Sequence, residues 1–264
     1  MKLMVNHQTH YHYTQAARNS VQSIKMIPQS SRHQLVESWH ISVPGQYTSK
    51  LDAFNNLWIT ASQRHDYHYL TIMAQGVVDL YDTELGYVDT GVSPILFLQG
   101  TNMTCCDLMM RDFAQTIVKV NDRHHLVLLA EQILQHIPYQ PESTSVTTSA
   151  IDSFYAGQGV CQDHAHVFIA MCRALQLPAR YVSGYLYDQN QPHLASHAWA
   201  EVFVENEWYC FDISNLLCNH SVVFARSMAS FLFSSYAQSF CRTAYTGLFP
   251  GYSLGDTDSR ISLC

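Results

Sequence analysis

A cysteine at position 161 occupies a setting that favours thiol chemistry. It lies in the segment GQGVCQDHAHVFIA at 157–170, where glycines precede a stretch that is apolar nearly all round. This stretch predicts a buried helix over 162–176 that begins beside Cys161. A helix N-terminus favours the thiolate, and its unpaired backbone N–H groups can donate to a developing oxyanion. Alone, this signal is weak, because a free cysteine is often a small buried residue.

His197 and Asp212 supply the other two groups that such a thiol needs. If HAWAEVFV and EWYCFDI form a hairpin that turns at Glu205-Asn206, the numbers of paired residues sum to 411, so Trp199 faces Asp212. His197 then lies one diagonal step from Asp212, roughly 7–8 Å between backbones, and the two side chains can span that gap. The opposite face is predicted to be core and consists of Ala198, Ala200, Val202, Val204, Phe211 and Ile213.

The chain can therefore provide a nucleophile, a base and an orienting group in the order Cys161, His197, Asp212. In this arrangement the imidazole takes the thiol proton, while the carboxylate fixes the imidazole tautomer and supports the imidazolium. A hairpin turn of odd length would break the register on which this geometry depends.

Composition excludes several other classes of protein. With 14 Lys and Arg against 21 Asp and Glu, the 264-residue chain has a formal charge of −7 and no basic stripe, which argues against nucleic-acid binding. Its apolar runs are far shorter than the roughly 20 residues that span a bilayer. The start, MKLMVNHQTHYHY, has no apolar core typical of a signal peptide. We therefore expect a cytoplasmic protein without a membrane partner, whose eight cysteines stay reduced.

The elements that must position these residues fall into two groups. The first ninety residues predict β-structure, since Trp39, Ile41 and Val43 alternate with polar residues and turn residues follow at Pro44-Gly45 and Asn55-Asn56. A small antiparallel sandwich or sheet over about 8–85 is the natural interpretation, with further strands at 57–60, 67–73 and 77–81.

Helical spacing begins near residue 95. Met109, Phe113 and Ile117 predict one helix, and a stronger one begins at Leu126 and is stopped by Pro138. A polar loop is expected over 139–150, followed by the Cys161 helix over 162–176. Three strands then follow, at 180–187, 197–204 and 207–213. The last forty residues have no clean period, and Asp256 and Asp258 there suggest an exposed turn.

The segments that contain Cys161, His197 and Asp212 resemble a known family. The run GVCQDHAHVFIAMCRALQLPARYVSGYLY, followed by SHAWAEVFVENEWYCFDISN, is similar to the bacterial branch of the transglutaminase-like superfamily over about 130–217. The first eighty-odd residues resemble, more weakly, the β-domain that precedes this core in bacterial proteins. The resemblance implies an α+β, papain-like core with Cys161 on a helix packed against an antiparallel sheet that bears His197 and Asp212. It predicts a β-domain over 1–90, the core over 91–225 and a C-terminal extension of open structure over 226–264.

The chain also departs from the family pattern. Asp212-Ile213-Ser214 stands where Asp-Pro-Thr is usual, and His164 takes a place where an aromatic residue is commoner. A Gly-Arg-Asp-Tyr type segment is not recognisable in 225–240. No Trp between 59 and 198 can play the oxyanion-donor role seen in the animal enzymes. The second donor is therefore open between Gln158, Tyr155 and another backbone N–H.

The resemblance implies thiol acyl chemistry on an amide of a protein or peptide substrate, without a cofactor. Hydrolysis of peptide or isopeptide bonds is favoured over transfer to an amine, because the resemblance is to the bacterial branch and no acidic cluster suggests the calcium dependence of the animal enzymes. A non-catalytic binding module on the same fold is one alternative. A metal hydrolase that uses some of the 15 His is another, although His164 and His166, two apart on a helix, do not face each other. The sequence leaves the oligomeric state open.

Overall fold

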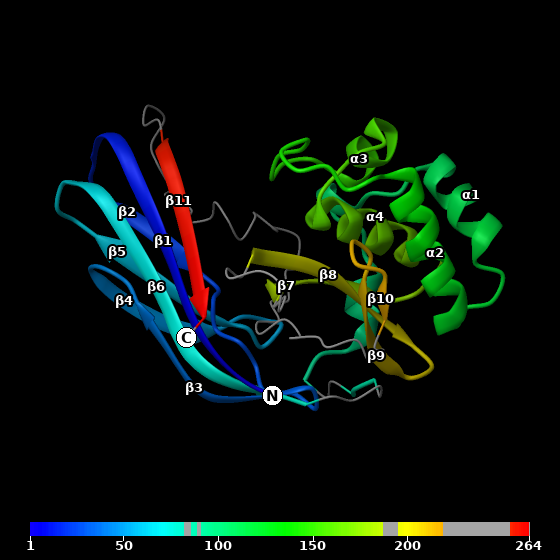
Figure 1. The fold of residues 1–264 in the computed structure, drawn as a ribbon, viewed down its shortest axis with the longest axis horizontal. Coiled ribbons are helices and arrows are strands. Elements are labelled where there is room, and N and C mark those ends of the chain that lie inside the picture. Colours follow the sequence, from blue (N-terminus) through cyan, green and yellow to red (C-terminus); the bar gives the residue numbers. More distant parts are fainter. Residues whose placement is uncertain (82–85, 89–90, 187–194, 219–253, 264) are drawn as a thin grey trace.

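The computed structural model has an α+β fold and describes residues 1–81, 86–88, 91–186, 195–218 and 254–263 (Figure 1). Within these described ranges, no helix is long and apolar enough to cross a membrane. The elements in chain order are β1 (Lys2–Ala17), β2 (Ser20–Ile24), β3 (Gln34–Ser42), β4 (Gln46–Leu51), β5 (Leu57–Gln63), β6 (Tyr67–Leu80), η1 (Pro94–Leu98), η2 (Asn102–Thr104), α1 (Leu108–Ile117), α2 (Arg123–His136), α3 (Ala150–Ala156), α4 (Cys161–Ala174), β7 (Ala179–Leu186), β8 (Ala195–Val204), β9 (Glu207–Asp212), β10 (Leu217–Cys218) and β11 (Leu254–Leu263).

The N-terminal strands form two antiparallel sheets, as the sequence predicts. Their strand orders are β11-β1-β6-β3 and β2-β5-β4. Both sheets contribute to one apolar core, in which Tyr11, Ile24, Ile59 and Leu70 are buried. The two strand segments predicted at 67–73 and 77–81 belong to the single long strand β6. The prediction of a small sandwich is confirmed, and its first strand begins earlier than expected.

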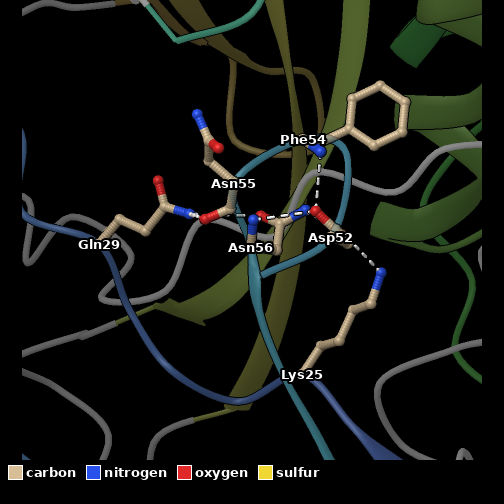
Figure 2. Close-up of polar contacts among 6 residues, drawn as sticks. All are labelled: Lys25, Gln29, Asp52, Phe54, Asn55 and Asn56. Carbon is tan, nitrogen blue, oxygen red and sulfur yellow. Dashed lines mark hydrogen bonds and ion pairs between the residues drawn. The ribbon is translucent and has the colours of Figure 1, made fainter. Parts of the chain in front are cut away.

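The turn after β4 is organised by one carboxylate and reaches the second half of the molecule (Figure 2). Asp52 accepts hydrogen bonds from the backbone N–H groups of Phe54 and Asn56 at 2.8 and 2.9 Å, and Lys25 Nζ lies 2.7 Å from its other oxygen. Burial alone would raise the pKa of Asp52, but the hydrogen bonds from Lys25 and Asn56 hold it below its usual value. The ring of Phe54 packs against Phe97, with 5.6 Å between the ring centroids. This turn therefore links the β-sandwich to the segment that precedes α1.

The end of the chain returns to the N-terminal sheet. Strand β11 pairs antiparallel with β1, from Val5 opposite Leu263 to Tyr13 opposite Leu254 (Figure 1). Asp258 lies in this strand opposite His10, so the turn expected at Asp256 and Asp258 is wrong. The segment 219–253, which includes 225–240, lies outside the described residues. The boundaries 1–90, 91–225 and 226–264 stay a prediction.

The second half is a four-stranded antiparallel sheet in the order β10-β9-β8-β7, with helix α4 packed against it. In Figure 1 helices α1 to α4 lie together at the right of the view, apart from the β-sandwich. The β8–β9 pairs run from Ala200 opposite Phe211 to Val204 opposite Glu207, which is the predicted register. The six residues predicted on the core face are all buried in one cluster with the helices.

Helix α1 has the predicted spacing but buries a neighbouring face. Met109 is 60% exposed, whereas Met110 and Ala114 are fully buried. Phe113 and Ile117 lie at the flank of the core, partly buried. Successive helical residues are about 100° apart, so a one-residue shift of the apolar stripe still satisfies the same spacing. Helix α3 was not predicted; Ser149 and Asp152 form a capping box at its start.

A buried ion pair fixes the strands of this sheet to the segment that enters it. Arg180 Nε on β7 lies 2.8 Å from Glu201 Oε2 on β8, and the Tyr87 hydroxyl donates to the same oxygen at 2.7 Å. The guanidinium lies 4.0 Å from the centre of the Trp208 ring on β9. Three strands and the Tyr87 segment therefore meet at one charged group, in a setting where an unpaired charge would be costly.

We predict that Glu201→Ala destabilises the protein by about 3–5 kcal/mol, because it leaves the buried Arg180 guanidinium without its counter-charge. Urea unfolding, followed by circular dichroism, measures this free energy. The double variant Arg180→Met/Glu201→Leu is the matched control and should lose less than the single variant. A single variant that unfolds within about 1 kcal/mol of wild type would contradict this view of the pair.

Candidate active site

Cys161 is the first residue of α4, where a tight approach of two segments holds it. Asp163, on the first turn, accepts hydrogen bonds from the Val160 N–H at 2.8 Å and from Thr144 Oγ1 at 2.6 Å. A Cβ at Gly159 would lie 2.8 Å from the Cβ of Asp163, so only glycine fits there. The thiol is half-buried. As predicted, it stands at a helix N-terminus beside backbone N–H groups that have no partner within the helix.

A second segment, Tyr139-Gln140, pairs with the chain two residues before the thiol. Tyr139 forms an isolated parallel bridge with Gly159, and the Gln140 N–H donates to the Gly159 carbonyl at 2.8 Å. Burial, together with the charge of Cys161, raises the pKa of Tyr139. Its hydroxyl therefore stays protonated near the thiol at neutral pH. Sequence reasoning did not select Tyr139, although it follows the Pro138 that ends α2.

His197 and Asp212 form a buried hydrogen-bonded pair. His197 Nε2 on β8 lies 2.7 Å from Asp212 Oδ2 at the end of β9, and each side chain is only 9% exposed. Burial alone would lower the pKa of His197. The hydrogen bonds to Asp212 and Cys161, and the charges of both groups, outweigh it and raise that pKa to about 10. Because Asp212 occupies Nε2, the ring offers Nδ1 to the thiol. The structure therefore brings together the three residues that the sequence selects.

Asn215 completes the surroundings of the carboxylate. Its side-chain amide donates to Asp212 Oδ2 at 2.8 Å, and its backbone N–H lies 3.3 Å from Asp212 Oδ1. Both carboxylate oxygens are thus hydrogen-bonded within a four-residue turn. Sequence reasoning missed this residue. The available signal was an Asn three positions after the Asp, a spacing at which polar side chains bond back to their own turn.

His164 and His166 occupy separate environments, as their spacing predicts. His164 Nε2 lies 2.8 Å from the Ile137 carbonyl, and its Nδ1 lies 2.8 Å from Ser214 Oγ. The ring of His166 packs against Tyr181, with 5.1 Å between centroids, and burial lowers its pKa to about 4. Among the described residues, no group of three or more His, Cys, Asp or Glu is arranged to hold a metal ion.

The remaining candidates are placed as follows. The Tyr155 hydroxyl donates to Asp107 Oδ2, at the start of α1, at 2.7 Å, so its hydrogen is used in that bond. Trp199 stacks beside His197 with 6.3 Å between ring centroids, so it forms part of the site. Gln158 and the backbone N–H groups of the first turn of α4 stay candidates for the oxyanion donors.

Two regions of the chain match known protein families. Residues 111–213 match the transglutaminase-like superfamily, and residues 3–79 match the bacterial transglutaminase-like N-terminal region. An uncharacterised protein of Mycobacterium leprae is 24% identical over 233 residues, covering 81% of this chain and 83% of its own. Uncharacterised proteins of Mycobacterium bovis and Mycobacterium tuberculosis are 27% identical over 251 residues, covering 80% of this chain and 78% of theirs.

A solved structure shares the whole fold. A Cytophaga hutchinsonii protein with a provisional cysteine-protease assignment superposes with a TM-score of 0.72 at 21% identity, over 100% of this chain and 91% of its own. At 21% identity, this structural similarity is evidence for a shared fold only. The match at 111–213 contains the helix and the hairpin on which the site is built. Residues 111–213 therefore match the transglutaminase-like superfamily core, and the bacterial transglutaminase-like N-terminal region precedes this core at residues 3–79.

Proposed function

We propose that this protein is a thiol enzyme that cleaves peptide or isopeptide amides through Cys161, His197 and Asp212. The observation that supports this most strongly is the buried His197–Asp212 pair, 2.7 Å apart, with the thiol at the other side of the imidazole. A strongly shifted titratable group held between a specific charge partner and a nucleophile is typical of functional sites.

In the first half of the reaction, the Cys161 thiolate, whose proton is held by His197, attacks the carbonyl carbon of the substrate amide. A carbon–sulfur bond forms while the carbonyl electrons move to oxygen, next to the N–H groups at the start of α4. As the carbonyl re-forms, the carbon–nitrogen bond breaks. The His197 imidazolium gives its proton to the departing amine or ammonia, and a thioester remains on Cys161.

In the second half, neutral His197 takes a proton from an attacking water molecule or amine. The new carbon–oxygen or carbon–nitrogen bond displaces Cys161 as the thiolate, and the charge pair with the imidazolium is restored. Asp212 holds the imidazole orientation throughout and supports its positive charge. We favour water as the acceptor; transfer to an amine and a non-catalytic binding role are the competing outcomes of the tests below.

We predict that iodoacetamide alkylates Cys161 at pH 6 at least about tenfold faster than it alkylates Cys105. An ordinary thiol loses about tenfold in rate for each pH unit below about 8.5, whereas proton transfer to His197 keeps Cys161 reactive. Peptide mass spectrometry follows both cysteines in one digest, so the exposed Cys105 is an internal reference.

The matched variant for this test is His197→Ala, in which the selective reaction of Cys161 should disappear. Equal alkylation rates for all eight cysteines in the wild-type protein would contradict the enzyme proposal and favour the non-catalytic binding module.

A second prediction concerns the pH dependence of stability, in a Cys161→Ser background that removes the titration of the thiol. The pairing with Asp212 raises the pKa of folded His197 above the ordinary value of about 6.5. The stability that it contributes is therefore complete below about pH 6.5 and is lost as the pH rises through the higher folded value.

The measurement is the urea midpoint between pH 6 and pH 10, compared with Cys161→Ser/Asp212→Asn. The asparagine variant keeps the shape of the side chain but lacks the charge, so its curve should be flatter. Parallel curves would contradict a charged His197–Asp212 pair.

The reaction type is tested by trapping the intermediate. A peptide library that contains glutamine and lysine isopeptide bonds is mixed with the enzyme, quenched in acid, and examined for an acyl group on the Cys161 peptide. In ¹⁸O-labelled water with a fluorescent primary amine present, hydrolysis predicts labelled carboxylate products. An amine adduct as the main product would replace hydrolysis by transfer. Cys161→Ala is the control and should trap nothing.

We also propose a cytoplasmic location. It is supported by Cys105, Cys106, Cys161 and Cys172, none of which forms a disulfide in the part of the chain that the structure describes. Cell fractionation tests it, and recovery in the periplasmic or secreted fraction would contradict it.

A further inference from the structure

His164 has no role in the proposed reaction, although this polar side chain is fully buried one turn along α4 from Cys161. Both of its ring nitrogens are bonded, Nε2 to the Ile137 carbonyl and Nδ1 to Ser214 Oγ, each at 2.8 Å. A carbonyl oxygen can only accept, so Nε2 carries the hydrogen. Nδ1 of the neutral ring then accepts from the Ser214 hydroxyl.

These two bonds join three segments that meet at the site. Ile137 ends α2, His164 lies on the nucleophile helix, and Ser214 lies inside the turn that follows β9. That turn begins with Asp212 and ends with Asn215, which bonds both carboxylate oxygens. A shift of Ser214 therefore moves the groups that orient the carboxylate. The two departures from the family pattern, His164 and Ser214, are bonded to each other.

The surroundings of the His164 ring disfavour its charged form. Burial lowers its pKa, and the charges that face it come from Asp163 on its own helix and from Asp212 and His197 on the sheet. The ring of Tyr139 lies on another side, with 6.2 Å between centroids. In the neutral ring with its hydrogen on Nε2, Nδ1 accepts from the Ser214 hydroxyl.

We propose that His164 is a positioning residue for the triad: by accepting the Ser214 hydroxyl at Nδ1, it fixes the Asp212 turn so that the carboxylate meets His197. This inference rests on the proposed thiol function. It assigns no contact with substrate to His164, which acts through Ser214 and the turn.

Two matched pairs of variants separate this role from simple packing. Ser214→Thr keeps the hydroxyl and Ser214→Ala removes it. In His164→Asn, an amide atom takes the place of Nδ1 and can still accept from Ser214. In His164→Gln, the amide takes the place of Nε2, so the Ile137 bond is kept and the Ser214 bond is lost.

The readout is the rate at which iodoacetamide alkylates Cys161, measured from pH 5 to pH 9 on the full-length protein. At pH 6, S214A and H164Q should react about tenfold more slowly than wild type, the effect of weakening the thiolate–imidazolium pair by one pKa unit, while S214T and H164N stay within about twofold. The double variant H164Q/S214A should lose no more than either single variant, because both remove the same bond.

The unfolding temperature of each variant is measured alongside. Lower unfolding temperatures with an unchanged pH profile in S214A and H164Q would overturn the proposal and leave a purely structural role. Equal loss in H164N and H164Q would also overturn it, because the Ser214 bond would then not matter. If wild-type Cys161 is no faster than Cys105, the thiol function itself fails, and the positioning role of His164 fails with it.

Discussion

The site depends on burying a carboxylate beside an imidazole. His197 and Asp212 are each 9% exposed, and a charge at that depth is tolerated only when it is paired and hydrogen-bonded. The imidazole, the Asn215 amide and the Asn215 backbone N–H together bond both carboxylate oxygens. With those bonds in place, the carboxylate can hold a positive charge on His197 up to about pH 10 and so keep the imidazole ready to exchange a proton with Cys161.

The rest of the core can be understood as the frame for this pair. The β8–β9 register decides that His197 and Asp212 share a face, while the alternating residues on the other face bury against α4. Helix α4 in turn brings its first residue, Cys161, to the imidazole. Two further contacts hold the frame to the β-sandwich, namely Phe54 on Phe97 and the pairing of β11 with β1. The N-terminal domain is therefore joined to the core by side chains and by the returning chain end.

Local patterns predicted much of this from sequence. The period-two alternation in the hairpin indicated its register, and the even two-residue turn at Glu205-Asn206, where both residues have positive φ, preserved it. What could not be predicted depended on contacts between distant segments. The predicted buried face of α1 was shifted by one residue, because two neighbouring faces of the helix carry apolar residues at the same helical spacing. The place of β11 depends on its pairing with β1 at the other end of the chain, where Leu263 lies opposite Val5. The bonds of His164 to Ile137 and Ser214 likewise join distant segments and could not be predicted without the fold.

The charge on His197 is the property that tests the proposed site most directly. Nitrogen-15 NMR of the imidazole, with the protein intact and Asp212→Asn as the control, reports the protonation of both ring nitrogens across pH. We predict that both nitrogens are protonated at pH 7 and that the wild-type ring titrates near pH 10, well above the control. A neutral ring at pH 7 that titrates near the ordinary value of about 6.5 would contradict the charged His197–Asp212 pair on which the site depends.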